Sequence, residues 1–381
     1  MAIAAAAQNA AAATILAVWS VSRTKETLPA ARRTRLAAAA SPARERNLFI
    51  CNTGTAHPEG SSAPRGSQPF GVAGYARLVE TRAIRDESDI ESVVGIANAV
   101  YPDDPITAHE FVSWGEQARE RCDLVADDNG SIVGAARTFF ESRRPNPWVH
   151  IWVPPAERRR GIGSALFGDA SAWARSKGYA GFEAWIREDA DESIAFASRL
   201  GFEETGRERG LSLDLTAIEA PVVQAPAGIE LTTWAKRPEV APGLHEVYAE
   251  AAVDIPGEED EEVDPFEEWL RNDMQSAGDR AEGTFVALAG DEVVGYAKFH
   301  FSAAQPTTVY HDMTGVKRAW RGRGIASALK ATQIRWAKEN GYEELRTSNE
   351  ERNAPIRKLN KRFGYQPAVG RIYLRGPLSA T

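Results

Sequence analysis

The chain has 381 residues, which is enough for two domains of ordinary size, each with its own hydrophobic core. A formal net charge of -8 at pH 7 argues against general affinity for nucleic acid, which requires a basic surface. The cysteines, Cys51 and Cys122, and the six histidines show no spacing typical of metal ligands. We therefore expect neither a nucleic-acid partner nor a bound metal.

Residues 1–78 differ in composition from the rest of the chain. Residues 1–40 are rich in alanine, and residues 52–74 are rich in Gly, Ser and Pro. This composition buries little apolar surface, so we expect a disordered, low-complexity tail. Two alternatives are a signal peptide, although the segment lacks a basic start, and a true start of translation near Val79. Polar residues interrupt the apolar run before it reaches spanning length, so we expect no membrane segment and a cytoplasmic protein.

Hydrophobic spacing between residues 79 and 217 predicts an α/β domain. The expected strands lie at residues 80–85, 122–127, 131–141, 148–153, 181–187 and 208–215. The expected helices are one capped by Ser88, one through Phe111 and Trp114, and two at residues 163–177 and 193–200. The predicted order is therefore β-α-α-β-β-β-α-β-α-β.

The second part of the chain repeats the first. Residues 218–227 contain two prolines and are expected to form a linker, which is followed by a second domain at residues 228–381. Within it, Pro265–Trp269 repeats Glu110–Trp114, and further similar segments recur at a nearly constant offset. A long internal repeat of this kind indicates duplication of a whole domain.

Each of the two domains contains a glycine-rich turn between a strand and a helix. The turns are Arg158–Gly163 and Arg321–Ala326. The first amide N–H groups of such a helix lack intrahelical partners, and the helix dipole places partial positive charge there. Glycines allow a phosphate to approach the backbone, and the arginines add charge-assisted hydrogen bonds. The spacing fits a pyrophosphate, but it matches neither the P-loop nor the dinucleotide fingerprint.

Both turns match the signature R/Q-x-x-G-x-G/A, and a valine lies five residues before each signature arginine. With these residues, the chain resembles the GNAT acyltransferase superfamily. The resemblance implies a mixed α/β fold made of two tandem domains, as in two-domain acetyltransferases of the mycothiol synthase type. Each domain would have a central, mostly antiparallel sheet with a splayed pair of parallel strands, flanked by helices.

The resemblance also implies acetyl-CoA as the co-substrate. In the first copy it assigns to acetyl-CoA the residues Val153, Arg158, Arg159, Arg160, Gly161, Ile162, Gly163 and Ser164. In the second copy it assigns Val316, Arg321, Gly322, Arg323, Gly324, Ile325, Ala326, Ser327 and Asn353. A backbone N–H group of the stretch Thr314–Val316 would stabilise the oxyanion.

Three residues of the second domain are candidates for the chemistry. Asp312 lies four residues before Val316, where several superfamily enzymes have a base. An aspartate titrates too low for this task unless burial raises its pKa, so His311 is a competing candidate. Equally, Asp312 and His311 could both serve only to form structural hydrogen bonds, with no role as a base. Asn360 occupies the position of the family's tyrosine; it can donate a hydrogen bond but cannot act as an acid, so water or another residue must protonate the thiolate.

The first domain lacks these groups. Val149, Ala190 and Ala197 occupy the positions of the base, the asparagine and the tyrosine. We therefore expect the first domain either to bind coenzyme A without performing chemistry or only to support the second.

The expected function is transfer of an acetyl group from acetyl-CoA to an amine of a small molecule or protein by direct attack on the thioester. The alternative is a non-catalytic acyl-CoA-binding or regulatory protein. The acidic run at residues 254–264 would attract a cationic amine if it lines the acceptor site, or it is simply a solvated loop. Nothing in the sequence indicates the oligomeric state.

Overall fold

A computed structural model describes residues 79–141, 144–256 and 262–380, so the predicted tail at residues 1–78 lies outside the described part. The first half (residues 79–217) contains β1 (Glu80–Ala83), α2 (Glu87–Val100), α3 (Ala108–Gln117), β2 (Glu120–Asp128), β3 (Ser131–Phe140), β4 (Trp148–Trp152), α4 (Ile162–Ser176), β5 (Gly181–Arg187), α5 (Asp191–Arg199) and β6 (Glu203–Asp214). The second half (residues 228–380) contains β7 (Glu230–Thr233), α6 (Ala241–Ala252), α7 (Phe266–Asp273), β8 (Thr284–Ala289), β9 (Glu292–Phe301), β10 (Thr308–Val316), α8 (Ile325–Glu339), β11 (Glu344–Glu350), α9 (Ala354–Arg362) and β12 (Gln366–Pro377).

Polar side chains cap the first two helices of the first half. The side chain of Asp86 caps α2 by accepting a hydrogen bond from the Asp89 amide at 3.0 Å. The prediction that Ser88 is this cap was wrong, because Ser88 lies inside the first turn, where its carbonyl accepts the Ser92 hydroxyl. Thr107 caps α3 together with Glu110 in a reciprocal capping box. The capping box at Thr107 fixes the end of the loop that joins α2 to α3.

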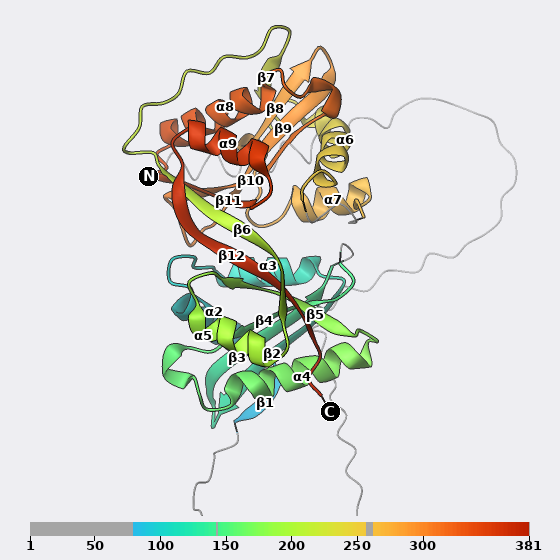
Figure 1. The fold of residues 1–381 in the computed structure, drawn as a ribbon, viewed down its shortest axis with the longest axis vertical. Coiled ribbons are helices and arrows are strands. Elements are labelled where there is room, and N and C mark those ends of the chain that lie inside the picture. The colour runs from blue at the N-terminus through green and yellow to red at the C-terminus, as the bar shows by residue number, and fades with distance from the viewer. Residues whose placement is uncertain (1–78, 142–143, 257–261, 381) are drawn as a thin grey trace, which may run out of the picture. The chain divides into compact units, whose positions relative to one another are not determined.

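The strands of both halves form one sheet, in the order β1-β2-β3-β4-β5-β12-β6-β11-β10-β9-β8-β7. The last strand of each half lies in the sheet of the other half. β12 pairs with β5 from Arg371↔Arg187 to Pro377↔Gly181, and β6 pairs with β11 from Glu344↔Asp214 to Glu350↔Glu208. β6 and β12 also pair with each other and run side by side between the two halves (Figure 1).

This exchange of strands completes both hydrophobic cores. Ile372 and Leu374 of β12 are buried in the core of the first half. Leu213 and Leu215 are buried in the core of the second half. Burying a side chain of this size contributes about 1.5–3 kcal/mol. Each half therefore depends on the other for part of its core, and we expect the two to fold together.

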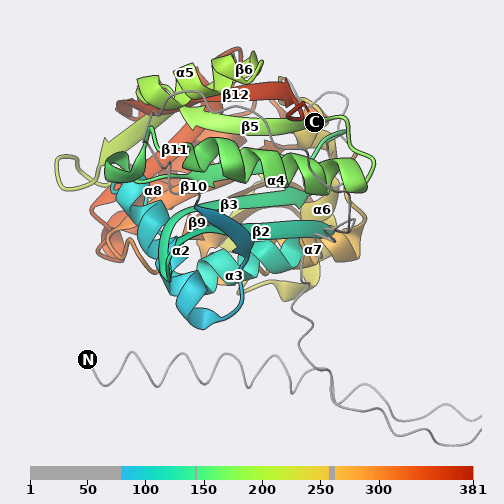
Figure 2. The ribbon, with the colours of Figure 1, turned by 90° about the horizontal axis from the view of Figure 1, so that it is seen from below.

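Helices cover both faces of the sheet in each half. In the first half, α4 and α5 lie on one face, and α2 and α3 lie on the other (Figure 2). In the second half, α8 and α9 lie on the face opposite to α6 and α7 (Figure 1). Residues 218–227 connect β6 to β7, and the carbonyl of Pro221 accepts hydrogen bonds from Arg335 of α8. Among the described residues, no helix combines the length and apolar character needed to cross a membrane.

Candidate functional site

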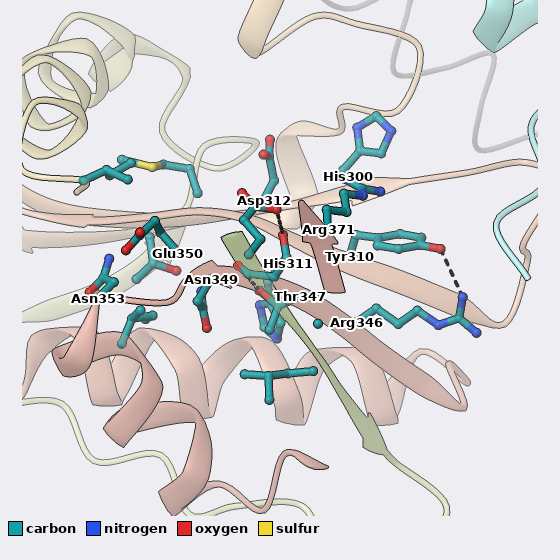
Figure 3. A pocket seen from close by; sticks show the side chains of 18 of the residues that line it. His300, Tyr310, His311, Asp312, Arg346, Thr347, Asn349, Glu350, Asn353 and Arg371 are labelled. Atoms are coloured by element: carbon teal, nitrogen blue, oxygen red, sulfur yellow. Dashed lines mark hydrogen bonds between the residues drawn. The ribbon is translucent and has the colours of Figure 1, made fainter. Parts of the chain in front are cut away.

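A cavity of about 1520 Å³ lies where β10 and β11 separate (Figure 3). These parallel strands pair only from Thr308↔Glu344 to Tyr310↔Arg346. Beyond that point both strands line the cavity, so the N–H groups on this edge of β10 face the cavity rather than a neighbouring strand. The first half also contributes to the wall, with residues such as Tyr101, Trp152 and Trp185.

The second glycine turn opens into this cavity at the N-terminus of α8. Gly324 is the N-cap residue with a φ of 86°, and no side chain caps the helix. Gly322 also has a positive φ, 75°. A Cβ added at Gly322 would meet nothing within 4 Å, and one at Gly324 would meet only Pro226, at 3.9 Å. The first amide groups of α8 therefore face open space and fit an anion such as a pyrophosphate.

Arginines of this turn are held by the strand and by a carboxylate. The Nε of Arg321 donates to the carbonyl of Val316 at 2.9 Å, and its Nη1 lies 2.7 Å from Asp254. Arg318 pairs with the same carboxylate at 2.6 Å. The hydrogen bond from Arg318, followed by that from Arg321, lowers the pKa of Asp254. The first residue of the predicted acidic run thus fixes the second glycine turn.

A β-bulge in β10 places two consecutive residues on the same side of the sheet. The register against β9 shifts between His311↔Phe299 and Thr314↔Ala297, so Asp312 and Met313 together oppose Lys298. Met313 packs against the core beside α6. Asp312 also points to this side, whereas His311 points to the opposite face, as Figure 3 shows. The bulge therefore presents the Asp312 carboxylate to the cavity.

Lys298 links Asp312 to a buried carboxylate. Its Nζ lies 2.8 Å from Asp312 and 2.8 Å from Asp279, and it also donates to the carbonyl of Asp273. Burial alone would lower the pKa of Lys298, but the charges of Asp312 and Asp279 outweigh burial and raise it. Burial would raise the pKa of Asp279, but His300 and Lys298 outweigh burial and lower it. A buried cation thus orients Asp312, whose side chain is 46% exposed.

Replacing Lys298 by methionine is expected to destabilise the protein by about 3–5 kcal/mol, because it leaves Asp279 buried without its cation. Chemical denaturation at pH 7 would measure this change. Adding Asp279→Asn to Lys298→Met should recover much of the loss, since the uncompensated charge is then removed. The pKa of Asp279 is lowered in the folded state. Its ionised carboxylate should therefore stabilise the folded protein above about pH 4, and this stabilisation should be lost as the pH falls further. An unchanged stability of Lys298→Met would contradict this assignment.

His311 is occupied by structural hydrogen bonds. Its Nδ1 lies 3.1 Å from Oε1 of Gln333, which can only accept, and its Nε2 accepts from the hydroxyl of Tyr365. Burial, followed by the charge of Lys330, lowers the pKa of His311 well below its ordinary value. Neither ring nitrogen keeps a lone pair for the proton of an amine. Of the two predicted bases, the geometry favours Asp312, although its carboxylate is 46% exposed and paired with Lys298 rather than buried as the sequence argument required.

The predicted asparagines lie on α9 and at its start. Asn353 is the N-cap residue of α9, but its side chain makes no capping hydrogen bond and lines the cavity. Its amide is therefore available to a ligand between the strands. Asn360 is fully buried, and its Nδ2 donates to Oδ1 of Asn349, a cavity residue, at 2.6 Å. Asn360 thus holds Asn349 in place but does not itself line the cavity.

The corresponding strands of the first half also pair only briefly, and aromatic side chains cluster beside them. β4 and β5 pair only at Trp148↔Glu183. Farther along, the rings of His150 and Trp185 lie 5.3 Å apart, and Trp152 stacks on His150. Burial lowers the pKa of His150 to about 3, so this ring is neutral. The register of β4 against β3 runs without a shift, so this strand presents no counterpart of Asp312.

The first glycine turn keeps its shape but lies apart from the cavity. Its N-cap glycine also has a positive φ, 84°. Residues 153–164 are all described, and none of them lines the cavity. Arg158 pairs with Glu192 at 2.7 Å, and Arg160 pairs with Asp128 at the same distance. Their assignment to acetyl-CoA stays a prediction, and the structure does not bring them together with the second turn.

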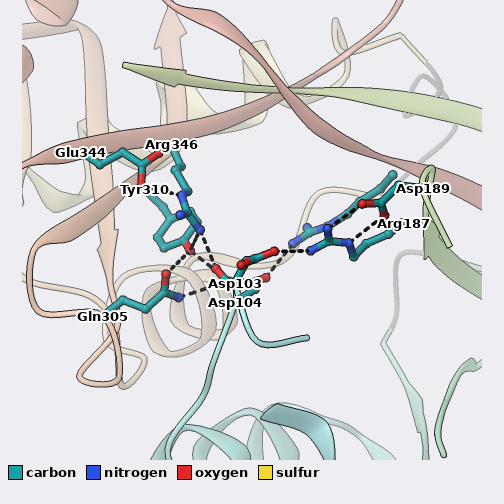
Figure 4. A network of polar contacts seen from close by, with 9 residues as sticks. Asp103, Asp104, Arg187, Asp189, Gln305, Tyr310, Glu344 and Arg346 are labelled. Atoms are coloured by element: carbon teal, nitrogen blue, oxygen red, sulfur yellow. Dashed lines mark hydrogen bonds and ion pairs between the residues drawn. The ribbon is translucent and has the colours of Figure 1, made fainter. Parts of the chain in front are cut away.

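A loop of the first half lines the cavity and makes polar contacts with the second half (Figure 4). It connects α2 to α3 and carries Asp103 and Asp104. The Asp104 carboxylate accepts the hydroxyl of Tyr310 at 2.9 Å, and Arg346 donates to the carbonyl of Asp103 at 2.6 Å. Burial, followed by the charge of Asp104, raises the pKa of Tyr310 to about 12. Because Tyr310 and Arg346 form the last pair before β10 and β11 separate, this loop anchors the start of the cleft.

Two lysines of the site were not predicted. Lys298 could not be found from sequence spacing, because its contact with Asp312 depends on the bulge. Lys330 is buried and lines the cavity. A signal for it existed, since a charged residue lies among the buried, mostly apolar residues of α8.

The family model described as the acetyltransferase (GNAT) family matches residues 84–202 and 242–365. A mycothiol acetyltransferase from Nocardia farcinica is 26% identical over 290 residues, which cover 73% of this chain and 90% of that protein. A mycothiol acetyltransferase from Brachybacterium faecium is 27% identical over 235 residues, covering 60% of this chain and 67% of that protein.

Solved structures share the fold. A tandem GNAT protein from the clavulanic acid biosynthesis pathway superposes with a TM-score of 0.66 at 22% identity, covering 80% of this chain and 99% of that one. A GCN5-related N-acetyltransferase from Sphaerobacter thermophilus gives a TM-score of 0.59 at 22% identity, covering 80% and 96%. The predicted fold of two tandem GNAT domains is thereby confirmed.

Proposed function

We propose that this chain, which belongs to the acetyltransferase (GNAT) family, transfers an acetyl group from acetyl-CoA to the amine of a small molecule in the cleft of its second half. One observation carries this proposal. A single cavity contains the open N-terminus of α8, the separated ends of β10 and β11, and the carboxylate of Asp312. These are an anion site, a slot for an extended chain, and a group that can take a proton.

The residues of the second half fit acetyl-CoA, which supplies an activated thioester. The first amide groups of α8 and the guanidinium of Arg321 would hold the pyrophosphate. The side-chain amide of Asn353 would bind the pantetheine arm, which lies between the strands. The N–H groups on the cavity edge of β10 would stabilise the negative charge that develops on the carbonyl oxygen.

Asp312 would take the proton of the attacking amine, directly or through a water molecule. The ion pair with Lys298 fixes the orientation of the Asp312 carboxylate. Because this side chain is only partly covered, the carboxylate stays accessible from the cavity. A positioned base of this kind contributes a factor of about 10² to 10⁴ to a rate.

The first half would shape the acceptor side of the cleft. Its loop at Asp103 and Asp104 and its aromatic residues complete a cavity that both halves line, which supports a small acceptor. The names of the mycothiol acetyltransferases also support a small molecule. The prediction of a cationic acceptor depends largely on residues 257–261, which lie outside the described residues, and it stays a prediction.

Release of free thiol from acetyl-CoA in the presence of a panel of small-molecule amines would test this function. We expect the protein to bind acetyl-CoA and at least one amine to accelerate thiol release above the rate of hydrolysis. Mass spectrometry of the product would show whether nitrogen is acetylated. Binding of acetyl-CoA without amine-dependent release would favour the alternative, a non-catalytic acyl-CoA-binding protein. Transfer to a protein but to no small amine would contradict the proposed acceptor class.

A further inference from the structure

Lys330 is a buried lysine in the second turn of α8. It is 1% exposed and lines the cavity. Its Nζ lies 5.4 Å from the centre of the Tyr365 ring, and its charge acts on His311 of β10. Within the described ranges, it has no hydrogen-bond or ion-pair partner. Lys330 therefore contributes to the cavity wall, and no carboxylate among the described residues compensates its charge.

The fold does not require a charge at this position. Lys330 lies six residues after Gly324, and the first half has Phe167 six residues after Gly161. Phe167 is part of the apolar core of the first half. An unpaired buried charge destabilises a protein, and burial lowers the pKa of Lys330 to about 7. A lysine that costs stability at a position suited to an apolar residue indicates a function.

The proposed reaction lacks an acid for the leaving thiolate, and three other described residues on this side of β10, Asn360, Tyr365 and His311, do not supply one. Asn360 cannot ionise, and its side chain is bonded to Asn349. The hydroxyl of Tyr365 donates to His311, and burial raises the pKa of Tyr365 well above its ordinary value. His311 is neutral, as described above. Lys330 lines this wall of the cavity, and its ammonium group can donate a proton.

We propose that Lys330 protonates the thiolate of coenzyme A as the acetyl group leaves it, an assignment that rests on the proposed function. The amine nitrogen forms a bond to the carbonyl carbon, and its proton passes to Asp312. The carbon–sulfur bond breaks, its electron pair stays on sulfur, and sulfur takes a proton from Nζ of Lys330. Neutral Lys330 then regains a proton from solvent, and Asp312 releases one.

Titration of the thiol of bound coenzyme A, followed by the ultraviolet absorbance of the thiolate, tests this assignment without turnover. An ammonium group close to sulfur stabilises the thiolate, whereas an apolar wall disfavours it. The bound thiol should titrate about one pH unit or more lower in the wild type than in Lys330→Met or Lys330→Gln. Lys361→Met removes an exposed lysine from α9 and should titrate like the wild type. Equal titration in the wild type and both Lys330 variants would overturn the assignment.

The same variants separate a chemical role from a structural one. Lys330→Met should raise the melting temperature, because an unpaired buried charge is replaced by an apolar side chain of similar size. Its kcat with an accepted amine should fall on the order of 100-fold, while its Kd for acetyl-CoA changes only a few-fold. A lowered melting temperature with unchanged kcat would assign Lys330 a structural role. Failure of the wild type to bind coenzyme A would instead contradict the proposed function itself.

Discussion

Replacing Gly324 by aspartate is expected to raise the Kd for acetyl-CoA at least ~100-fold, because it places a carboxylate where the pyrophosphate should bind. Two unit charges about 4 Å apart near a protein surface repel each other by ~4 kcal/mol, which corresponds to more than a factor of ~100. The variant should still fold, since aspartate is among the residues that best tolerate a positive φ such as the 86° of Gly324. Equilibrium dialysis with labelled acetyl-CoA would measure the change.

Gly161→Asp is the matched control for this variant. Gly161 is the N-cap residue of α4 with a φ of 84°, so the substitution has the same chemistry and a similar backbone cost. The first turn does not line the cavity, and we expect Gly161→Asp to bind acetyl-CoA like the wild type. Loss of binding in Gly161→Asp but not in Gly324→Asp would place the donor in the first half and contradict the proposed site.

Asp312→Asn is expected to reduce kcat by a factor of about 10² to 10⁴, because asparagine keeps the shape of the side chain but cannot take the proton of the amine. The Kd for acetyl-CoA should change little, since Asp312 lies in the bulge of β10 and not in the glycine turn before α8. Steady-state thiol release with an accepted amine, together with direct binding of acetyl-CoA, would separate the two effects.

The control for Asp312→Asn is the same substitution at Asp291, a fully exposed carboxylate in the turn between β8 and β9. Asp291→Asn should leave both kcat and the Kd for acetyl-CoA unchanged. If Asp312→Asn retained full kcat, the amine would have to lose its proton to another group, and the role of the bulge would need revision.

Local patterns in the sequence predicted the duplicated fold and its two glycine turns. Helix and strand periodicity, together with Gly and Pro positions, decide where elements begin and end. The strand predicted at residues 181–187, for example, is β5 at Gly181–Arg187. The glycines with positive φ at the start of α4 and α8 follow from the same reasoning, because glycine adopts a positive φ more readily than other residues.

The exchange of β6 and β12 could not be predicted in this way. The alternation of apolar residues in a strand specifies which face is buried, but it does not specify which sheet the strand joins. Leu213 would be buried equally well in either half, and only the tertiary structure shows that it packs in the second. Pairing between the strands of the two halves depends on tertiary packing, which local sequence patterns do not specify.

The contacts of the site depend on register and on side-chain direction. The bulge in β10 moves Asp312 to the same side as Met313, and this one-residue shift brings Asp312 to Lys298. In the first half, sequence comparison showed that the chemical groups were missing. It did not show that the rings of His150 and Trp185 contact each other.

Calorimetric titration of the wild-type protein with acetyl-CoA tests most directly the claim that only the second half holds the donor. We expect one site per chain, because the glycine turn of the first half lies apart from the cavity and its Arg158 and Arg160 are paired with carboxylates. Two sites per chain would contradict this division of roles, and no binding at all would contradict the proposed function.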